Sequence, residues 1–210
     1  MSEEWKDPEH ALAYLQRADA IPHRAAGEST LLAEVPANAA RVLDLGCGDG
    51  RLLALVVLKC PNAHGVAVDS SPLMLTKAKE RFSGNVRVQV KEHDLNHPLP
   101  AEWGKFDVVC SSFAIHHVPH ERKRELYREA FDTLNPPGVF CNLEHVSSAT
   151  EGVRRRFWEE MGACPEDEDP SNKLLDAETQ LRWLREIGFQ DVDCYWKWRE
   201  LALLIGKKSR

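Results

Sequence analysis

The sequence predicts an α/β fold: a doubly wound, mostly parallel sheet of seven strands that closes with an antiparallel hairpin. Two observations lead to this prediction. Apolar, β-rich runs alternate along the chain with helix-length patterns, which is typical of a parallel sheet covered by helices on both faces. Only a tight turn near residues 198–200 separates the last two strand candidates, and it is too short for a parallel crossover.

The strand candidates are short apolar runs bounded by turn-forming or polar residues. The run at 106–113 is almost continuously apolar, which suits a central parallel strand. The run at 86–90 alternates strictly and indicates a half-exposed strand. The complete set of predicted strands is 41–45, 63–69, 86–90, 106–113, 139–145, 189–197 and 200–206.

The helix candidates lie between these strands, at 50–60, 70–82, 121–134 and 176–187. Ser71 is expected as the N-cap of the second helix, with Pro72 as its first residue. Apolar residues of the third helix fall on one stripe, which predicts packing against the sheet. Residues 165–173 are acidic and rich in helix breakers, so we expect a surface loop there.

Composition narrows the class of protein. The chain has 210 residues, 43% of them hydrophobic, which suits one globular domain with a full core. The net charge of −6 argues against nucleic acid, and we expect the basic clusters at 121–125 and 152–158 to be solvated helix faces. No apolar stretch approaches the roughly 20 residues of a membrane span. The polar start is unlike a signal peptide, so a cytoplasmic protein is expected.

The six cysteines form no CxxC pair and no Cys/His cluster with zinc-finger spacing. Most lie in apolar runs, where a free thiol behaves as a small hydrophobic group. We therefore expect neither a metal site nor disulfide bonds.

Three glycines, Gly46, Gly48 and Gly50, follow the first predicted strand directly. Glycines at this place either serve a tight core turn or let a ligand lie against the backbone. Ligands of doubly wound folds bind beyond the carboxyl ends of the strands, so this turn is a candidate site. The dinucleotide pattern G-x-G-x-x-G fails, because Arg51 stands where its third glycine would be.

Two carboxylates indicate the chemistry of the ligand. Asp44 precedes the glycines, where it would repel a pyrophosphate but attract a cation. Asp69 ends the second predicted strand, where a carboxylate can accept hydrogen bonds from both hydroxyls of a ribose. The pattern therefore predicts a nucleoside with a positively charged tail and no phosphates.

Five segments in order resemble the class I S-adenosylmethionine-dependent methyltransferases, and the resemblance extends over about 41–206. They are VLDLGCGDG, GVAVDSSPLMLTKAKERF, EHDLNHPLP, FDVVCSSFAIHHV and LNPPGVF. The resemblance implies a Rossmann-like domain at 41–210 that binds S-adenosylmethionine and releases S-adenosylhomocysteine. It also implies a helical N-terminal cap at 1–40 that folds over the cofactor.

The resemblance implies a cofactor-binding set along the ends of the first four strands. Its members are Arg24, Asp44, Gly46, Cys47, Gly48, Asp69, Ser70, Met74, Asp94, Leu95 and Ser111. The glycine turn and Ser111 are expected at the methionine moiety, with Asp44 near its amino group. Asp69, with Ser70 beside it, is expected at the ribose.

Three of these assignments have alternatives that the sequence leaves open. Met74, expected on the adenine ring, is equally typical of helix–sheet packing. Asp94, expected with Leu95 at the adenine edge, could serve a turn instead. Arg24, expected at the cofactor carboxylate, could be a surface residue beside Glu28.

On the acceptor side, the resemblance implies Phe113, His116 and Glu144, and it suggests that His117 points away. His116 is the candidate general base, although methyl transfer can also proceed by positioning alone. We expect a small-molecule methyltransferase that acts as a monomer or homodimer, without a metal or a membrane. The alternatives are a tRNA-modification-related enzyme, an enzyme that forms a carboxylated cofactor, and a non-catalytic partner subunit.

Overall fold

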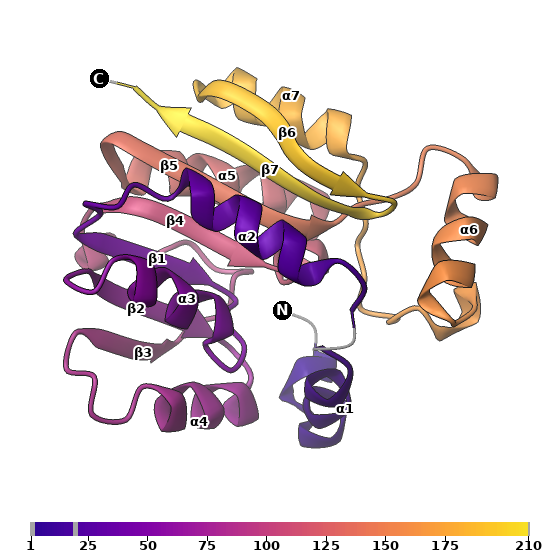
Figure 1. Cartoon of the computed structure of the whole chain (residues 1–210), viewed down its shortest axis with the longest axis horizontal. Coiled ribbons are helices and arrows are strands. Elements are labelled where there is room, and N and C mark those ends of the chain that lie inside the picture. The colour runs from indigo at the N-terminus through magenta and orange to yellow at the C-terminus, as the bar shows by residue number, and fades with distance from the viewer. Residues whose placement is uncertain (1–2, 19–20, 210) are drawn as a thin grey trace.

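The computed structural model describes residues 3–18 and 21–209, and its core is a seven-stranded sheet in the order β3-β2-β1-β4-β5-β7-β6 (Figure 1). The strands are β1 (Arg41–Leu45), β2 (His64–Asp69), β3 (Val88–Glu92), β4 (Phe106–Ser112), β5 (Leu134–His145), β6 (Gln190–Trp198) and β7 (Leu201–Lys208). β1 to β5 are mutually parallel, and β7 pairs antiparallel with both β5 and β6. The predicted sheet and its closing hairpin are confirmed.

Helices cover both faces of this sheet. The longer ones are α1 (Pro8–Ala18), α2 (Arg24–Glu34), α3 (Arg51–Lys59), α4 (Pro72–Arg81), α5 (His120–Thr133), α6 (Glu151–Met161) and α7 (Ala177–Ile187). Leu31 of α2 and Val56 of α3 belong to the core on one face, whereas Tyr127 of α5 and Leu184 of α7 belong to the core on the other. This arrangement follows the alternation of side chains along each buried strand.

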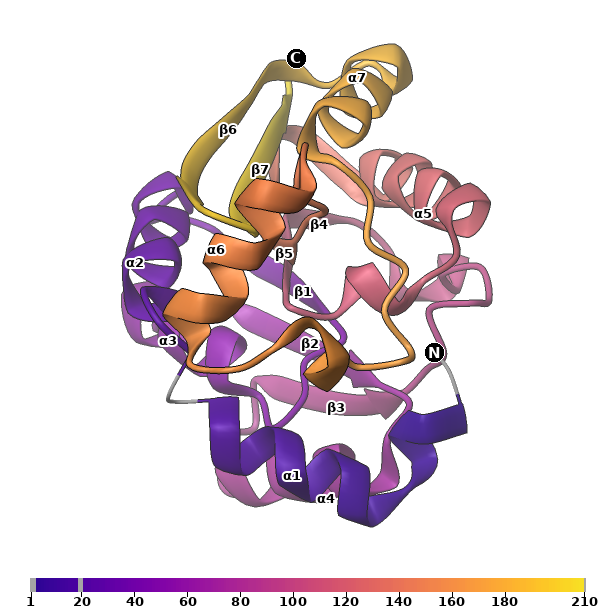
Figure 2. The same cartoon turned by 90° about the vertical axis from the view of Figure 1, so that its right-hand side faces the viewer.

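Two helices lie outside these layers. The ribbon arrows of β1 and β4 point toward α1 and α6, which lie in front of the sheet edge in the perpendicular view (Figures 1 and 2). The carboxyl edge of the parallel strands is thus covered by segments from both ends of the chain. The reversal of strand order between β1 and β4 also lies there, so any ligand site at this point is an enclosed one.

Local boundaries differ from prediction where the sequence signal is weak. β3 begins two residues later than expected, at Val88. β5 begins at Leu134 and takes in the Asn-Pro-Pro-Gly segment that we expected to precede it. Ser71 occupies the N-cap of α4, but its side chain makes no capping hydrogen bond.

The segment expected to be a solvated basic face of α5 is one only in part, because Glu121, Arg124 and Glu125 are exposed whereas Lys123 is buried. Lys123 is fully buried, and its ammonium donates to the Lys173 carbonyl at 3.1 Å. Arg122 donates to the Leu95 carbonyl at 2.9 Å and pairs with Glu129. These long side chains hold loops at the sheet edge, a tertiary role that a charge run does not reveal.

Across the described ranges 3–18 and 21–209, no helix is both long enough and apolar enough to cross a membrane. Within the same ranges, no three His, Cys, Asp or Glu side chains are grouped so that they could hold a metal ion.

Candidate functional site

Two cavities lie at the carboxyl edge of the sheet, and Phe113 lines both. The first, which we call the glycine-loop cavity, has a volume of about 100 Å³ and includes Gly46, Cys47, Gly48 and Asp69 in its wall. The second, the histidine cavity, has a volume of about 310 Å³. Its lining includes Tyr14, Arg17, Phe113, His116, His145, Phe157, Trp158, Asp167, Asp169 and Asn172.

The three glycines of the loop have different reasons for being glycine. All three have positive φ, at 67° for Gly46, 53° for Gly48 and 83° for Gly50. A Cβ at Gly46 would lie 2.2 Å from the Ala114 Cβ, and one at Gly50 would lie 2.5 Å from the Phe82 ring. A Cβ at Gly48 would meet only the Met74 sulfur, at 3.9 Å. Packing therefore requires two of the glycines, and the third leaves the backbone open to a ligand.

Asp69 ties the glycine loop to the end of β2. Its carboxylate accepts hydrogen bonds from the backbone N–H groups of Gly48 at 2.9 Å and Ser71 at 2.8 Å. Burial raises the pKa of Asp69, although these backbone bonds oppose the rise. Each carboxylate oxygen keeps a further lone pair, so Asp69 can still accept hydroxyls of a ribose.

Asp44 supplies a buried carboxylate suited to a cation. It is 1% exposed, and its Oδ2 has no hydrogen-bond partner within the part of the chain that the structure describes. Burial raises its pKa to about 7. A positively charged ligand group beside it would favour the ionised form, so the site fits the sulfonium or ammonium of S-adenosylmethionine.

Arg24 is buried rather than on the surface, and it is also paired with Glu28, at 2.9 Å. Arg51 bonds the same carboxylate at 2.9 and 3.0 Å. Two guanidinium groups in the cavity wall thus share one carboxylate. Such a cluster can bind an anionic ligand group.

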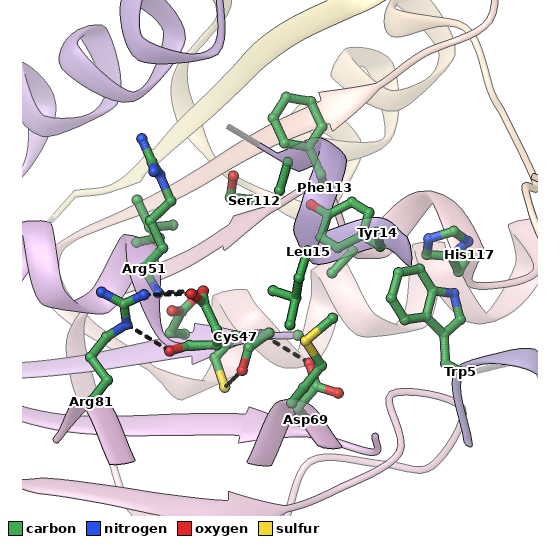
Figure 3. Close-up of a pocket in the computed structure, with 18 of the residues that line it drawn as sticks. Trp5, Tyr14, Leu15, Cys47, Arg51, Asp69, Arg81, Ser112, Phe113 and His117 are labelled. Atoms are coloured by element: carbon green, nitrogen blue, oxygen red, sulfur yellow. Dashed lines mark hydrogen bonds and ion pairs between the residues drawn. The ribbon is translucent and has the colours of Figure 1, made fainter. Parts of the chain in front are cut away.

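Residues of the N-terminal segment close the glycine-loop cavity. Tyr14 and Leu15 of α1 project between Phe113 and the loop around Cys47, and Trp5 lies beside His117 (Figure 3). A volume of about 100 Å³ is below the roughly 300 Å³ at which ordinary ligand pockets begin. Binding of a nucleoside ligand therefore requires these side chains to move.

The remaining residues predicted at the cofactor lie elsewhere or have a second role. Met74 lines the cavity and also packs with Trp5 and Ala11. The buried Ser70 does not line the cavity. Leu95 does not line it either, although its side chain lies 3.7 Å from the position that a Cβ on Gly46 would have. Asp94 also lies outside the lining, and it accepts a hydrogen bond from the Asn96 N–H in a turn.

Ser111 also differs from expectation. It is fully buried, and its hydroxyl donates to the Leu45 carbonyl at 2.8 Å, which joins β4 to β1. Its neighbour Ser112 lines the glycine-loop cavity instead, because successive side chains of a strand point in opposite directions.

His116 lines the histidine cavity and bonds Glu144 behind it, with 2.7 Å between Nδ1 and Oε1. Glu144 lines neither cavity and acts only through this ring. Its carboxylate also accepts from the His145 N–H at 3.0 Å and the Asn142 amide at 3.3 Å. Burial raises the pKa of Glu144, and the bonds from Asn142 and His145 oppose this rise. In its ionised form the carboxylate holds Nδ1–H of His116 and leaves the lone pair on Nε2.

A chain of hydrogen bonds that starts at a backbone carbonyl determines which group of Asn142 faces Glu144. The Leu175 carbonyl can only accept, so Gln180 donates its amide there and accepts from the Tyr127 hydroxyl. Tyr127 in turn accepts from Asn142 at 3.0 Å, and Asn142 therefore presents its NH₂ group to Glu144. Burial lowers the pKa of His116 well below 6.5, so its imidazole is neutral near pH 7.

A second histidine–carboxylate pair faces the same cavity. His145 and Glu200 are joined by 3.0 Å between Nε2 and Oε2, and Glu200 is 1% exposed. Glu200 was not anticipated, since no motif marks the first residue before β7. The antiparallel pairing that places Leu201 opposite His145 brings it there.

His117 departs from prediction, whereas the acidic segment at 165–173 is largely exposed, as predicted, and also contributes to a cavity wall. His117 lines the glycine-loop cavity, and its ring centroid lies 5.0 Å from that of Trp5. Its Nδ1 bonds the hydroxyl of Ser171, which is 1% exposed. Asp167 and Asp169 line the histidine cavity, so the predicted surface loop forms part of a wall.

Phe113 divides the two cavities in a strained conformation. Its φ is 53°, in the left-handed region, and its N–H donates to the Leu143 carbonyl at 2.8 Å. The Arg24 guanidinium lies 5.4 Å from its ring centroid. A non-glycine residue held in this conformation marks a position where neighbouring structure overrides backbone preference.

Comparisons with known proteins agree with this geometry. A family model described as a methyltransferase domain matches residues 42–138. The chain is 25% identical over 195 residues to a carboxy-S-adenosyl-L-methionine synthase of Wolinella succinogenes, across 85% of this chain and 80% of that protein. It is 36% identical over 143 residues to a trans-aconitate 2-methyltransferase of Methylobacterium nodulans, across 65% of this chain and 52% of that protein.

A solved structure shares the fold. An O-methyltransferase family protein from Burkholderia thailandensis superposes with a TM-score of 0.75 at 21% identity. The match covers 98% of this chain and 61% of that chain. This chain therefore spans about half the length of the trans-aconitate relative and about three fifths of the Burkholderia protein.

Proposed function

The chain belongs to the class I S-adenosylmethionine-dependent methyltransferase family, and we propose that it methylates a hydroxyl oxygen of a small molecule bound in the histidine cavity. S-adenosylmethionine would lie in the glycine-loop cavity. Asp69 would hold its ribose, Asp44 its cationic part and Arg24 its carboxylate.

The observation that carries this proposal is the His116–Glu144 pair beside a second cavity. Nε2 of His116 bears a lone pair and has no hydrogen-bond partner among the residues described. An acceptor hydroxyl can give its proton to this nitrogen, and Glu144 then stabilises the imidazolium that forms. The acceptor oxygen keeps the electron pair of its O–H bond for the new bond to carbon.

The bound cofactor supplies an electrophilic methyl carbon on sulfur, and the electron pair of the broken C–S bond stays on the sulfur of S-adenosylhomocysteine. The protein's contribution is to hold the two reactants in line and to exclude water. Tyr14, Ala18 and Phe113 line both cavities, so the reacting groups would meet at the boundary that these three residues form.

The walls of the histidine cavity favour a hydroxyl acceptor over a polycarboxylate. Asp167 and Asp169 line it, and the pKa of Asp169 lies below its ordinary value because bonds from Ser171, with the nearby His117 and His10, together outweigh the effect of burial. These two carboxylates disfavour a ligand with several carboxylates, and Arg17 in the same lining offsets only part of their charge. A volume of about 310 Å³ suits a small molecule.

One observation supports a second candidate, an enzyme that forms a carboxylated cofactor. The guanidinium groups of Arg24 and Arg51 both lie in the wall of the glycine-loop cavity, and guanidinium groups are suited to hold carboxylates of a ligand. Mass spectrometry of the nucleoside released from purified protein separates the candidates, because only the second gives a carboxylated species.

The test of the first candidate is methyl transfer from labelled S-adenosylmethionine to a panel of small hydroxylated compounds. We expect labelled ether products with wild type and a large loss of rate with His116→Gln. Label found only in amines, in carbon positions or in tRNA would contradict the proposal.

A further inference from the structure

The His145–Glu200 pair has no role in the proposed reaction, yet it is built like the His116–Glu144 pair. Each histidine lines the histidine cavity, and each is bonded to a buried glutamate. The two imidazole rings have centroids 5.7 Å apart, at 73° to each other. Both pairs therefore face one ligand of ordinary size.

The hydrogen-bond direction of the second pair can also be assigned. Burial tends to raise the pKa of Glu200, but hydrogen bonds from His145 and Ser148 and the nearby charge of Arg154 together outweigh it, so the net pKa lies below its ordinary value. An ionised Glu200 only accepts, so Nε2 of His145 carries the proton and donates it. Nδ1 keeps a lone pair, and no described residue donates to it.

The two histidines of the cavity lining thus each keep one ring nitrogen that can accept a hydrogen bond, Nε2 of His116 and Nδ1 of His145. One hydroxyl has one proton and can donate to only one of them. Filling both requires a ligand with two donors. A nitrogen left unfilled in a closed, dry site lowers affinity by the cost of an unpaired polar group.

The remaining lining residues of the histidine cavity indicate what kind of ligand skeleton carries these two donors. Phe157 lies against His145, with ring centroids 5.4 Å apart, and Trp158 packs edge-on against Phe157 at 5.5 Å. Tyr14 and Phe113 line the same cavity, so aromatic side chains form part of its wall. Aromatic walls favour a planar aromatic ligand.

We infer that the acceptor is an aromatic compound with two hydroxyl groups, one at His116 and the other held by His145. His145 is then a specificity-determining residue, with Glu200 positioning its ring. The inference rests on the proposed function for the assignment of His116 as the base, but recognition by His145 can be measured without turnover.

The test is calorimetry on the protein saturated with S-adenosylhomocysteine. The probes are 2,3-dihydroxynaphthalene, 1,3-dihydroxynaphthalene and 2-naphthol, which share one frame and differ in the number and spacing of hydroxyls. We expect at least one of the diols to bind about tenfold more tightly than 2-naphthol, the value of one hydrogen bond made inside a cavity.

The decisive variant is His145→Phe, which keeps a ring against Phe157 but has no nitrogen. The ratio of diol to naphthol affinity should fall to about one in this variant and decrease in Glu200→Gln. The matched control is His64→Ala, an exposed histidine at the start of β2, which should keep the wild-type ratio.

Three results would overturn the inference: equal affinities of wild type for all probes, an unchanged ratio in His145→Phe, or no binding of any probe. Methyl transfer to the same probes is scored separately. Diol-selective binding that depends on His145, without any transfer, supports the inference while contradicting the proposed function.

Discussion

The glycine-loop cavity and the histidine cavity share Phe113 but are built by different means. About half of the residues that line the glycine-loop cavity lie at or just beyond the ends of β1, β2 and β4, and the rest come from the N-terminal segment and nearby helices. The histidine cavity is assembled from α1, the ends of β4 and β5, α6 and the segment after it. A site formed by local turns can be found from short motifs, and a site formed by distant segments cannot.

The two cavities also differ in charge. Asp44, Asp69 and Arg24 give the glycine-loop cavity ionisable groups suited to a zwitterionic nucleoside. Two histidines and aromatic side chains dominate the acceptor side of Phe113. We therefore expect substitutions in one cavity to alter cofactor affinity and substitutions in the other to alter turnover, and four predictions test this separation.

The largest effect is expected for His116→Gln. Loss of a general base costs about 10²–10⁴-fold in turnover, whereas affinity for S-adenosylhomocysteine should stay near that of wild type. In wild type, activity should be lost as pH falls through the pKa of His116, and burial places that acid limb below 6.5. The measurement is a pH–rate profile with calorimetry of both proteins. An equal loss of cofactor affinity would show that the two cavities do not have separate functions.

Asp69→Ala should weaken binding of S-adenosylmethionine and S-adenosylhomocysteine alike. Removing charge-assisted bonds to both ribose hydroxyls costs about 2–3 kcal/mol, roughly 30- to 150-fold in affinity. Asp193→Ala, a substitution on the edge strand β6, is the control. Unchanged cofactor affinity in a folded Asp69→Ala variant would show that Asp69 does not bind the ribose.

Affinity for S-adenosylmethionine should rise with pH up to about 7, the pKa to which burial raises Asp44. Below that pH the carboxyl group is protonated. It must lose its proton before it can pair with a cation, and this weakens cofactor binding. The affinity can change by at most about tenfold per pH unit, equivalent to about 1.4 kcal/mol of binding free energy. Titrations from acid to neutral pH should show this slope in wild type and a flat line in Asp44→Asn. A slope that survives in the variant belongs to another group.

The smallest effect concerns the boundary itself. Because Phe113 has φ of 53°, glycine should be better tolerated there than alanine. We expect Phe113→Gly to be more stable than Phe113→Ala by about 1 kcal/mol, the reverse of the usual order. Urea denaturation of both variants measures the difference. Higher stability of the alanine variant would show that the strain is relieved when the ring is removed.

The fold and much of the glycine-loop cavity could be predicted because their signals are local. Alternating strands and helices determined the sheet, and Asp44, Gly48 and Asp69 each stand at the end or just beyond the end of a strand. The parallel register of β1 and β2 brings these strand ends together without reference to the rest of the chain. The separate roles of the three glycines could not be predicted from the sequence, because they depend on packing against Ala114 and Phe82.

Only the tertiary structure decided the acceptor side. Nothing in the sequence near residue 200 relates Glu200 to His145; the pairing of β5 with β7 does. The acidic segment at 165–173 has the composition of a surface loop, yet its placement beneath α6 turns Asp169 toward a cavity. Strand order and turn chemistry are properties of neighbouring residues, whereas a cavity wall depends on which distant segments pack together, and many sequences satisfy the same packing.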